Sequence, residues 1–350
     1  MSKLLPFQIN RSVAVGCLIL LASLFVLLTV YKADVQKGRY KGHDIFFIWS
    51  AGHQIAHGEN PYSRIQGSDT LINEKYPTYL PGFYLIVSGY VALGHETFDE
   101  WLSFWRLASF AIHFAIGVFL FFVLLPRGGF WLALFGSQFW LLSRWTLEIM
   151  RSGQIDALAI AILLVSIWIL PRCKRTGLIL FGASLSIKQI GIFMLPVYLL
   201  LESDLHQPLM WNLREGVKNL LYIAALPFLI CLPFLIWDAK GLVLSLLFSA
   251  TRLPAGLKVP SIDALLGYVG LVGKIPMLVL MACIYFLVLR RKVGRFGAAL
   301  ALFLTFVSFN SVVHTHYLSW FCPIVGLAME EIWSSAVAPR QGHSNTPGQN

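Results

Sequence analysis

Apolar runs of roughly 20 residues, the length at which a helix crosses a bilayer, recur along most of the chain and constrain its fold more than any other feature. Only 13% of the 350 residues are charged, whereas a soluble protein carries about 25%. This charge is too sparse to cover a water-facing surface. It argues against a soluble enzyme and excludes a disordered, collagen-like or nucleic-acid-binding chain. The sequence therefore predicts an all-α, polytopic membrane helix bundle.

The order of the runs predicts one integral membrane domain, residues 1–333, followed by a disordered cytoplasmic tail, residues 334–350. A first outer loop, residues 32–105, contains an amphipathic helix at 44–57 and a short apolar segment at 82–94 that we expect to be re-entrant or juxtamembrane. With one run folded as a hairpin, we expect about 10 transmembrane helices. The runs long enough to span are 13–31, 106–125, 130–147, 154–171, 177–201, 218–237, 275–290, 296–313 and 317–333.

Basic residues give the predicted orientation. The net charge is +10, and the turns at 171–175 and 290–295 are strongly basic. Lys and Arg accumulate on cytoplasmic loops. We therefore predict a multi-pass protein of a plasma or inner membrane with a cytoplasmic N-terminus and a functional site on the non-cytoplasmic side.

One region leaves two topologies open. In the first, residues 177–201 form a helical hairpin broken near Lys188, and residues 238–274 form a second outer loop. In the other, 177–201 is one span and a weak span lies within 241–273. We favour the hairpin, because the polar segment 251–258 is costly inside a bilayer.

Four polar clusters fall on the predicted non-cytoplasmic side, at 42–45, 76–79, 151–156 and 314–317. Lys188, at the apex of the expected hairpin, can join them. An intramembrane lysine costs about 2.5–3.5 kcal/mol at a helix centre, which marks it as a functional candidate, although it can also snorkel to an interface.

Asp44 begins the amphipathic helix and has two readings. It can cap the free amides of the first turn, or act as a general base at a membrane-facing cavity, and the two roles are compatible. His53 and His57 have the i, i+4 spacing of two metal ligands. Without an adjacent glutamate of the HExxH type or an obvious third ligand, we expect packing or lipid contact rather than zinc.

The remaining candidates also have two readings. Arg151 and Asp156 can form a structural ion pair, or Arg151 can bind an anion that Asp156 orients. His314 and His316 can be interfacial residues. Beside Tyr317 they also suit a sugar-phosphate site, where imidazole donates to phosphate oxygens and an aromatic face covers the sugar.

Taken in order, these motifs resemble those of the family 87 glycosyltransferases and, more loosely, of GPI mannosyltransferase I. The motifs are 44–52 (DIFFIWSAG) with 58–62 (GENPY), 76–81 (YPTYLP), 151–156 (RSGQID), 177–188 with Pro196, and 314–320 (HTHYLSW). The resemblance implies a GT-C type fold and a polyprenyl-phosphate sugar as donor. One departure is that His43, and not an acidic residue, precedes Asp44, which disfavours a metal-dependent mechanism.

The predicted function is an inverting transfer of a hexose or pentose, mannose-like being favoured, from that donor to a glycan or lipid acceptor of the cell envelope. The alternative is a multi-pass transporter or lipid flippase. We expect no cofactor; a divalent metal is possible but not favoured. The resemblance implies Asp44 as the catalytic base, Lys188, Arg151, His314 and His316 at the donor phosphate, and His43, Tyr76, Tyr79, Gln154 and Tyr317 at the substrates.

Overall fold

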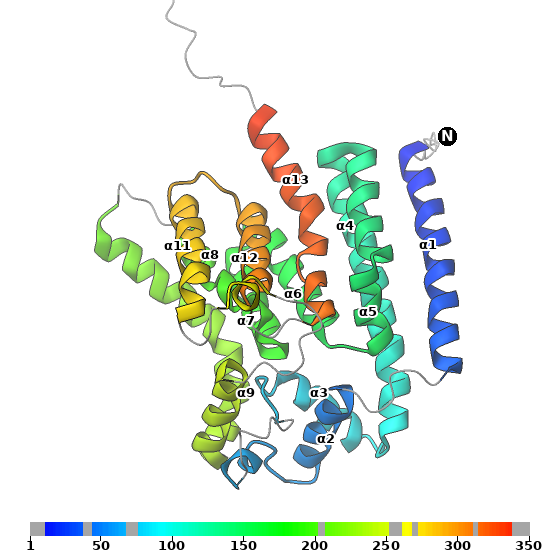
Figure 1. Cartoon of the computed structure of the whole chain (residues 1–350), viewed down its shortest axis with the longest axis vertical. Helices are drawn as coiled ribbons and strands as arrows, with labels where there is room; N and C mark the ends of the chain where they lie inside the picture. The colour runs from blue at the N-terminus through cyan, green and yellow to red at the C-terminus, as the bar shows by residue number, and fades with distance from the viewer. Residues whose placement is uncertain are drawn as a thin grey trace, which may run out of the picture.

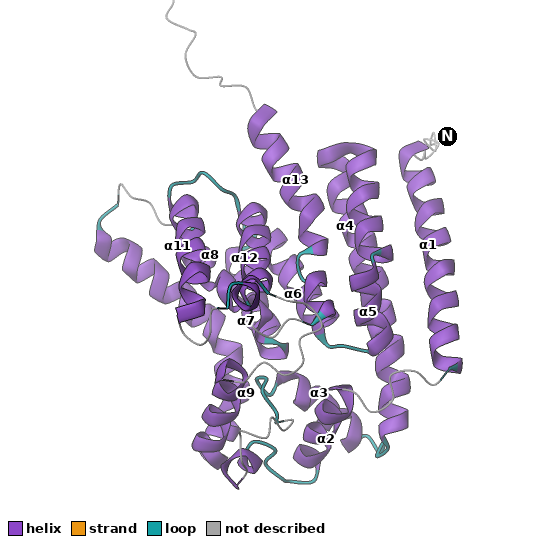
Figure 2. Cartoon of the chain, in the orientation of Figure 1, coloured by secondary structure: helices purple, strands orange, loops and turns teal. Residues whose placement is uncertain are grey.

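The chain forms a helical bundle, seen in a computed structural model that describes residues 11–37, 44–67, 76–201, 207–251, 261–267, 272–310 and 314–337. Every regular element in these ranges is a helix (Figures 1 and 2). The elements are α1 (Arg11–Gln36), α2 (Asp44–Ala56), η1 (Ser63–Gly67), α3 (Gly82–Ala92), α4 (Phe98–Leu142), α5 (Arg144–Ser152), α6 (Asp156–Ile169), α7 (Lys174–Ile187), η3 (Gln189–Met194), α8 (Leu195–Leu200), α9 (Leu209–Thr251), α10 (Ile262–Leu265), η4 (Val272–Lys274), α11 (Ile275–Leu289), α12 (Arg295–Phe309), η5 (Thr315–Ser319) and α13 (Cys322–Val337).

Within the described ranges, three helices are long and apolar enough to cross a membrane: α1, α4 and the Leu209–Phe248 part of α9. The pair α5 and α6, bent by 120° at a short break, can provide a fourth span. Large apolar side chains such as Leu18, Phe25 and Ile236 are exposed on these helices, as expected for surfaces that face lipid. The helices indicate that the chain associates with a membrane, as the sequence predicts.

Helix length does not establish the predicted number of about ten spans. The helices α6, α7, α11 and α12 have 14 or 15 residues, so they are about 21–23 Å long, less than the bilayer core of about 30 Å. The ten spans and the cytoplasmic N-terminus stay predictions, and the tail at 338–350 lies outside the described residues.

The apolar runs 106–125 and 130–147 form the two arms of a hairpin within α4. The chain turns at Gly129, whose φ of +76° is readily adopted only by glycine. The indole Nε1 of Trp140 donates to the His113 carbonyl oxygen at 2.8 Å and so ties the arms together. The second arm ends at Leu142, earlier than predicted, because Ser143 leaves the helical region and caps α5.

The predicted hairpin within 177–201 is confirmed. The rings of Phe181 in α7 and Tyr198 in α8 stack with centroids 4.1 Å apart, which is possible only if the chain reverses between them. The reversal begins at Lys188, where the backbone is extended between α7 and η3.

The segment 238–274 is not simply a loop, which corrects the prediction. Helix α9 bends at Asp238, where the backbone leaves the helical region, and then continues to Thr251. Its last turns pack on η1, within the first predicted outer loop.

Two short helices, α2 and α3, lie together at one end of the long helices, in the lower part of Figure 1. Their bounds confirm the expected amphipathic helix and the short segment at 82–94. Helix α3 begins against the end of α7, since a Cβ added to Gly82 would lie 2.5 Å from the Ser186 carbonyl oxygen. This close approach brings the first loop next to Lys188.

Candidate active site

One cavity gathers polar residues from segments far apart in the sequence. It contains about 860 Å³ of atom-free space, part of it open to solvent, between α2, η1, the start of α3, the Lys188 break, α9 and η5. Eight residues of the predicted site line it together: Asp44, Tyr76, Tyr79, Gln154, Lys188, His314, His316 and Tyr317. Their roles stay predictions, but the predicted convergence of the four polar clusters is present.

Asp44 stands at the edge of this cavity as the first residue of α2. A carboxylate in the first turn interacts favourably with the positive end of the helix dipole. The residues directly before Asp44 lie outside the described part of the chain, so the capping role of Asp44 stays a prediction.

Lys188 and Asp156 form a buried ion pair at the base of the cavity. The Lys188 Nζ lies 2.7 Å from Asp156 Oδ2, and Trp320 Nε1 donates to Asp156 Oδ1 at 2.6 Å. Asp156 is fully buried and Lys188 is 5% exposed. The sequence-based alternative in which Asp156 pairs with Arg151 is therefore wrong.

Aromatic rings surround the Lys188 ammonium. The ring centroids of Tyr79, Tyr317 and Trp320 lie 5.2, 5.9 and 5.9 Å from Nζ, within cation–π range. Asp156 takes one of the three N–H donors of the ammonium. Lys188 is thus held in one position, charge-balanced by Asp156, and can still donate into the cavity that it lines.

Arg151 does not line this cavity, which corrects its predicted place at the donor phosphate. Its Nε and Nη2 donate to the two carboxylate oxygens of Asp34 at 2.6 and 3.0 Å. This bidentate pair joins α5 to α1. We therefore do not propose Arg151 as a phosphate ligand.

Arg64 is a cavity-lining residue that the sequence interpretation missed. It belongs to η1 and lies over the Tyr76 ring, with 5.6 Å between the guanidinium carbon and the ring centroid. Gln54 and Thr78 line the same cavity. The signal for Arg64 was a basic residue directly after the turn at 58–62, within a loop already assigned to the site.

His314 and His316 stack in parallel, with ring centroids 5.4 Å apart, and Tyr317 lies edge-on to both. The pKa of His316 is lowered to about 4, chiefly by burial; the charge of Asp156 opposes this shift, and the charge of Lys188 adds to it. Asp44 also acts to raise this pKa. His316 is therefore neutral near pH 7 and offers a hydrogen-bond donor rather than a positive charge.

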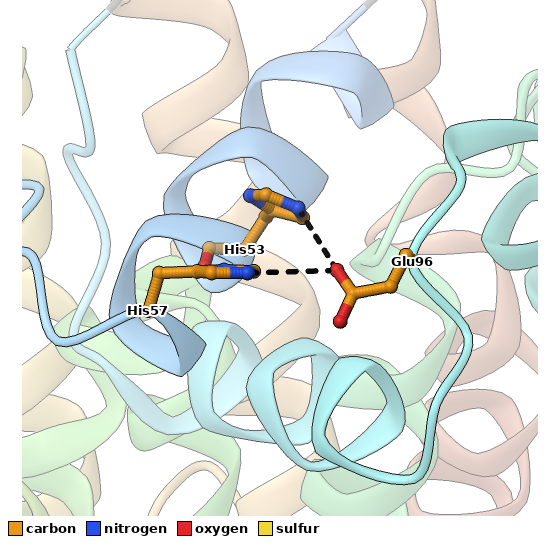
Figure 3. Close-up of side chains that lie close together, drawn as sticks. All are labelled: His53, His57 and Glu96. Atoms are coloured by element: carbon orange, nitrogen blue, oxygen red, sulfur yellow. Dashed lines mark hydrogen bonds and ion pairs between the residues drawn. The ribbon is translucent and has the colours of Figure 1, made fainter.

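His53 and His57 do not line the cavity. Their Nε2 atoms face the Glu96 carboxylate, His53 from the last turn of α2 and His57 from directly after it (Figure 3). Glu96, from the turn between α3 and α4, is a third group of the metal-ligating type that was not evident in the sequence.

Protein-family models, curated proteins and solved structures were compared with the chain, and none of them matches it. The functional argument therefore rests on the geometry above and on the motifs of the sequence.

The buried ion pair gives the first prediction. We expect Asp156→Asn or Lys188→Met alone to lower the free energy of unfolding by about 3–5 kcal/mol, because each leaves an uncompensated buried charge. The double variant should recover much of this loss. Thermal unfolding of the purified protein in detergent measures the cycle, with exposed Lys240→Met as the control; additive single effects would contradict the pairing.

The lowered pKa of His316 gives a pH prediction. Between the usual pKa of 6.5 and about 4, the unfolded chain binds more protons than the folded one. Stability should therefore fall as the pH falls through this window, by up to about 1.4 kcal/mol per pH unit from this residue. His316→Gln should have a flatter profile of thermal midpoint against pH, and coincident profiles would show that His316 does not cause the effect.

Proposed function

We propose that the chain is a membrane glycosyltransferase that moves a hexose or pentose from a polyprenyl-phosphate sugar to a hydroxyl of a glycan or lipid acceptor. One observation carries the proposal: a single cavity joins Asp44, Lys188, two histidines and four tyrosines, in a chain of which only 13% of the residues are charged. Several of these residues also belong to the motifs that resemble those of the family 87 glycosyltransferases, and this resemblance points to the same reaction.

Asp44 serves as the general base. Its carboxylate takes the proton of the acceptor hydroxyl while the hydroxyl oxygen attacks the anomeric carbon. The bond from that carbon to the phosphate oxygen breaks on the opposite face, and the phosphate leaves with the electron pair. The configuration at the anomeric carbon is therefore inverted.

The leaving phosphate is stabilised by groups that are already in position. Lys188 and Arg64 provide positive charge, and neutral His316 donates a hydrogen bond, with His314 beside it. A monophosphate develops less charge than a pyrophosphate, so fixed donors of this kind supply much of the required stabilisation. Arg64 takes the role that the sequence interpretation gave to Arg151.

The rings of Tyr76, Tyr79 and Tyr317 suit the sugar. Aromatic faces cover the apolar faces of a pyranose or furanose, and Gln154 offers both a donor and an acceptor for hydroxyl groups. Helix α2, amphipathic and short, fits the interface between lipid and water, where a prenyl chain stays in the bilayer while its phosphate enters the cavity.

The proposed general base, Asp44, allows a direct test of the proposed function. Asp44→Asn should keep expression and donor binding but abolish transfer, measured as release of polyprenyl phosphate from a polyprenyl-phosphate sugar by the purified protein. Asp99→Asn is a matched control, because Asp99 is exposed near the start of α4 outside the cavity lining. Retained turnover in Asp44→Asn would refute the role of Asp44, and movement of intact donor without release of phosphate would favour the transporter alternative.

A second test compares the two arginines. Arg64→Gln should lower kcat/KM for the donor about tenfold or more, the loss expected for a charge-assisted contact of about 1.5–3 kcal/mol. Arg151→Gln, which breaks the pair with Asp34, should lower stability but leave kcat/KM of the folded protein near the wild-type value. The reverse order of kinetic effects would restore Arg151 as the phosphate ligand.

A further inference from the structure

We propose that His53, His57 and Glu96 form a binding site for a divalent transition-metal ion of the Zn²⁺ type, outside the proposed active site. His53 lies in the last turn of α2, His57 directly follows the end of this helix, and the glutamate approaches from the turn between α3 and α4 (Figure 3). None of the three lines the cavity that contains Asp44.

The spacing of the ligand atoms suits one ion. Glu96 Oε2 lies 3.2 Å from His53 Nε2 and 3.7 Å from His57 Nε2, and all three ligand atoms lie within 4.8 Å of one another. Ligands at about 2.0–2.2 Å from a tetrahedral zinc ion are about 3.4 Å apart. Small side-chain rotations are therefore enough to bring the three ligand atoms to the separations found around a bound zinc ion.

The hydrogen bonding of His57 prepares it as a ligand. Its Nδ1 lies 2.9 Å from the His53 carbonyl oxygen, which can only accept, so Nδ1 carries the proton in this contact. The Nε2 lone pair is then available on the side of Glu96. Metal-bound histidines are commonly oriented by such a bond from the other ring nitrogen.

The charges of the three groups also suit a cation. The imidazole rings of His53 and His57 stack with centroids 4.3 Å apart, and the Nε2 atoms of both lie close to the anionic carboxylate of Glu96. A divalent cation between them would bind the carboxylate and two nitrogen lone pairs at once.

The ligand types select the class of metal. Imidazole nitrogen suits zinc, copper and nickel, whereas calcium and magnesium prefer sites built of oxygen atoms. Three protein ligands leave a fourth position for water or for a group from another molecule. Such an ion would join the C-terminal end of α2 to the turn before α4, whether or not the chain transfers sugars.

Metal titration of the full chain tests the proposal. The protein is purified in detergent without a histidine tag, stripped of metal and titrated with Zn²⁺, and binding and the thermal midpoint are followed. We expect one ion to bind at this site and to raise the midpoint. We expect His57→Ala and Glu96→Gln to weaken that binding by about 10–100-fold or more, since even outer-shell changes cost this much.

Two matched variants serve as controls. His95 precedes Glu96 in the sequence, but its ring stacks on Tyr90. Glu59 is an exposed acidic residue shortly after α2 that does not belong to the group of three. His95→Ala and Glu59→Gln should bind Zn²⁺ as the wild type does. The proposal is overturned if the wild type binds no Zn²⁺, or if the ligand variants bind it as tightly as these controls. Zinc binding is measured without sugar donor, so a failure of the transfer assay leaves this result unaffected.

Discussion

The buried pair of Lys188 and Asp156 is the interaction on which the arrangement of the cavity depends. Lys188 lies at the break between α7 and η3, Asp156 opens α6, and Trp320 binds the second carboxylate oxygen from the residue after η5. Separating any of these segments would leave a charge or a polar group uncompensated in the interior, which costs several kcal/mol. The pair therefore holds three stretches of chain together, and these stretches carry Gln154, Lys188, His314, His316 and Tyr317 of the cavity wall.

This pairing also changes the electrostatic character of the cavity. Because Asp156 balances the charge of Lys188, the ammonium acts as a fixed hydrogen-bond donor more than as an isolated cation, and the surrounding rings restrict it further. The positive charge available to an anion comes in larger part from Arg64, at the more exposed edge. An anionic group in the cavity would then lie between a buried donor, Lys188, and a solvent-exposed one, Arg64.

The sequence predicts the helices and breaks of this protein better than it predicts which residues form ion pairs with one another. Apolar periodicity and length identify the amphipathic helix at Asp44, and the polar residue within an apolar run identifies the break at Lys188. The ionic partners were assigned wrongly, because Arg151 pairs with Asp34 across 117 positions and Asp156 pairs with Lys188. Helical periodicity shows which face of a helix is polar, but it does not show which other helix that face will meet. The 14- and 15-residue helices show the same limit, since an apolar run does not reveal where the helix inside it ends.

The position of Asp44 depends on contacts at the other end of its helix. Helix α2 has 13 residues, about 20 Å, and a helix of this length is marginally stable by itself in water. Its path is set by packing: a Cβ on Gly52 would overlap the Val87 side chain of α3, and Trp49 packs on Phe98 at the start of α4 with ring centroids 5.6 Å apart. A general base must be held to within about 0.5 Å of its productive position. If the C-terminal end of so short a helix is displaced, its N-terminal end, which carries Asp44, moves by a similar amount. The group around His53 does not line the cavity, but it is mechanically linked through α2 to the carboxylate of Asp44.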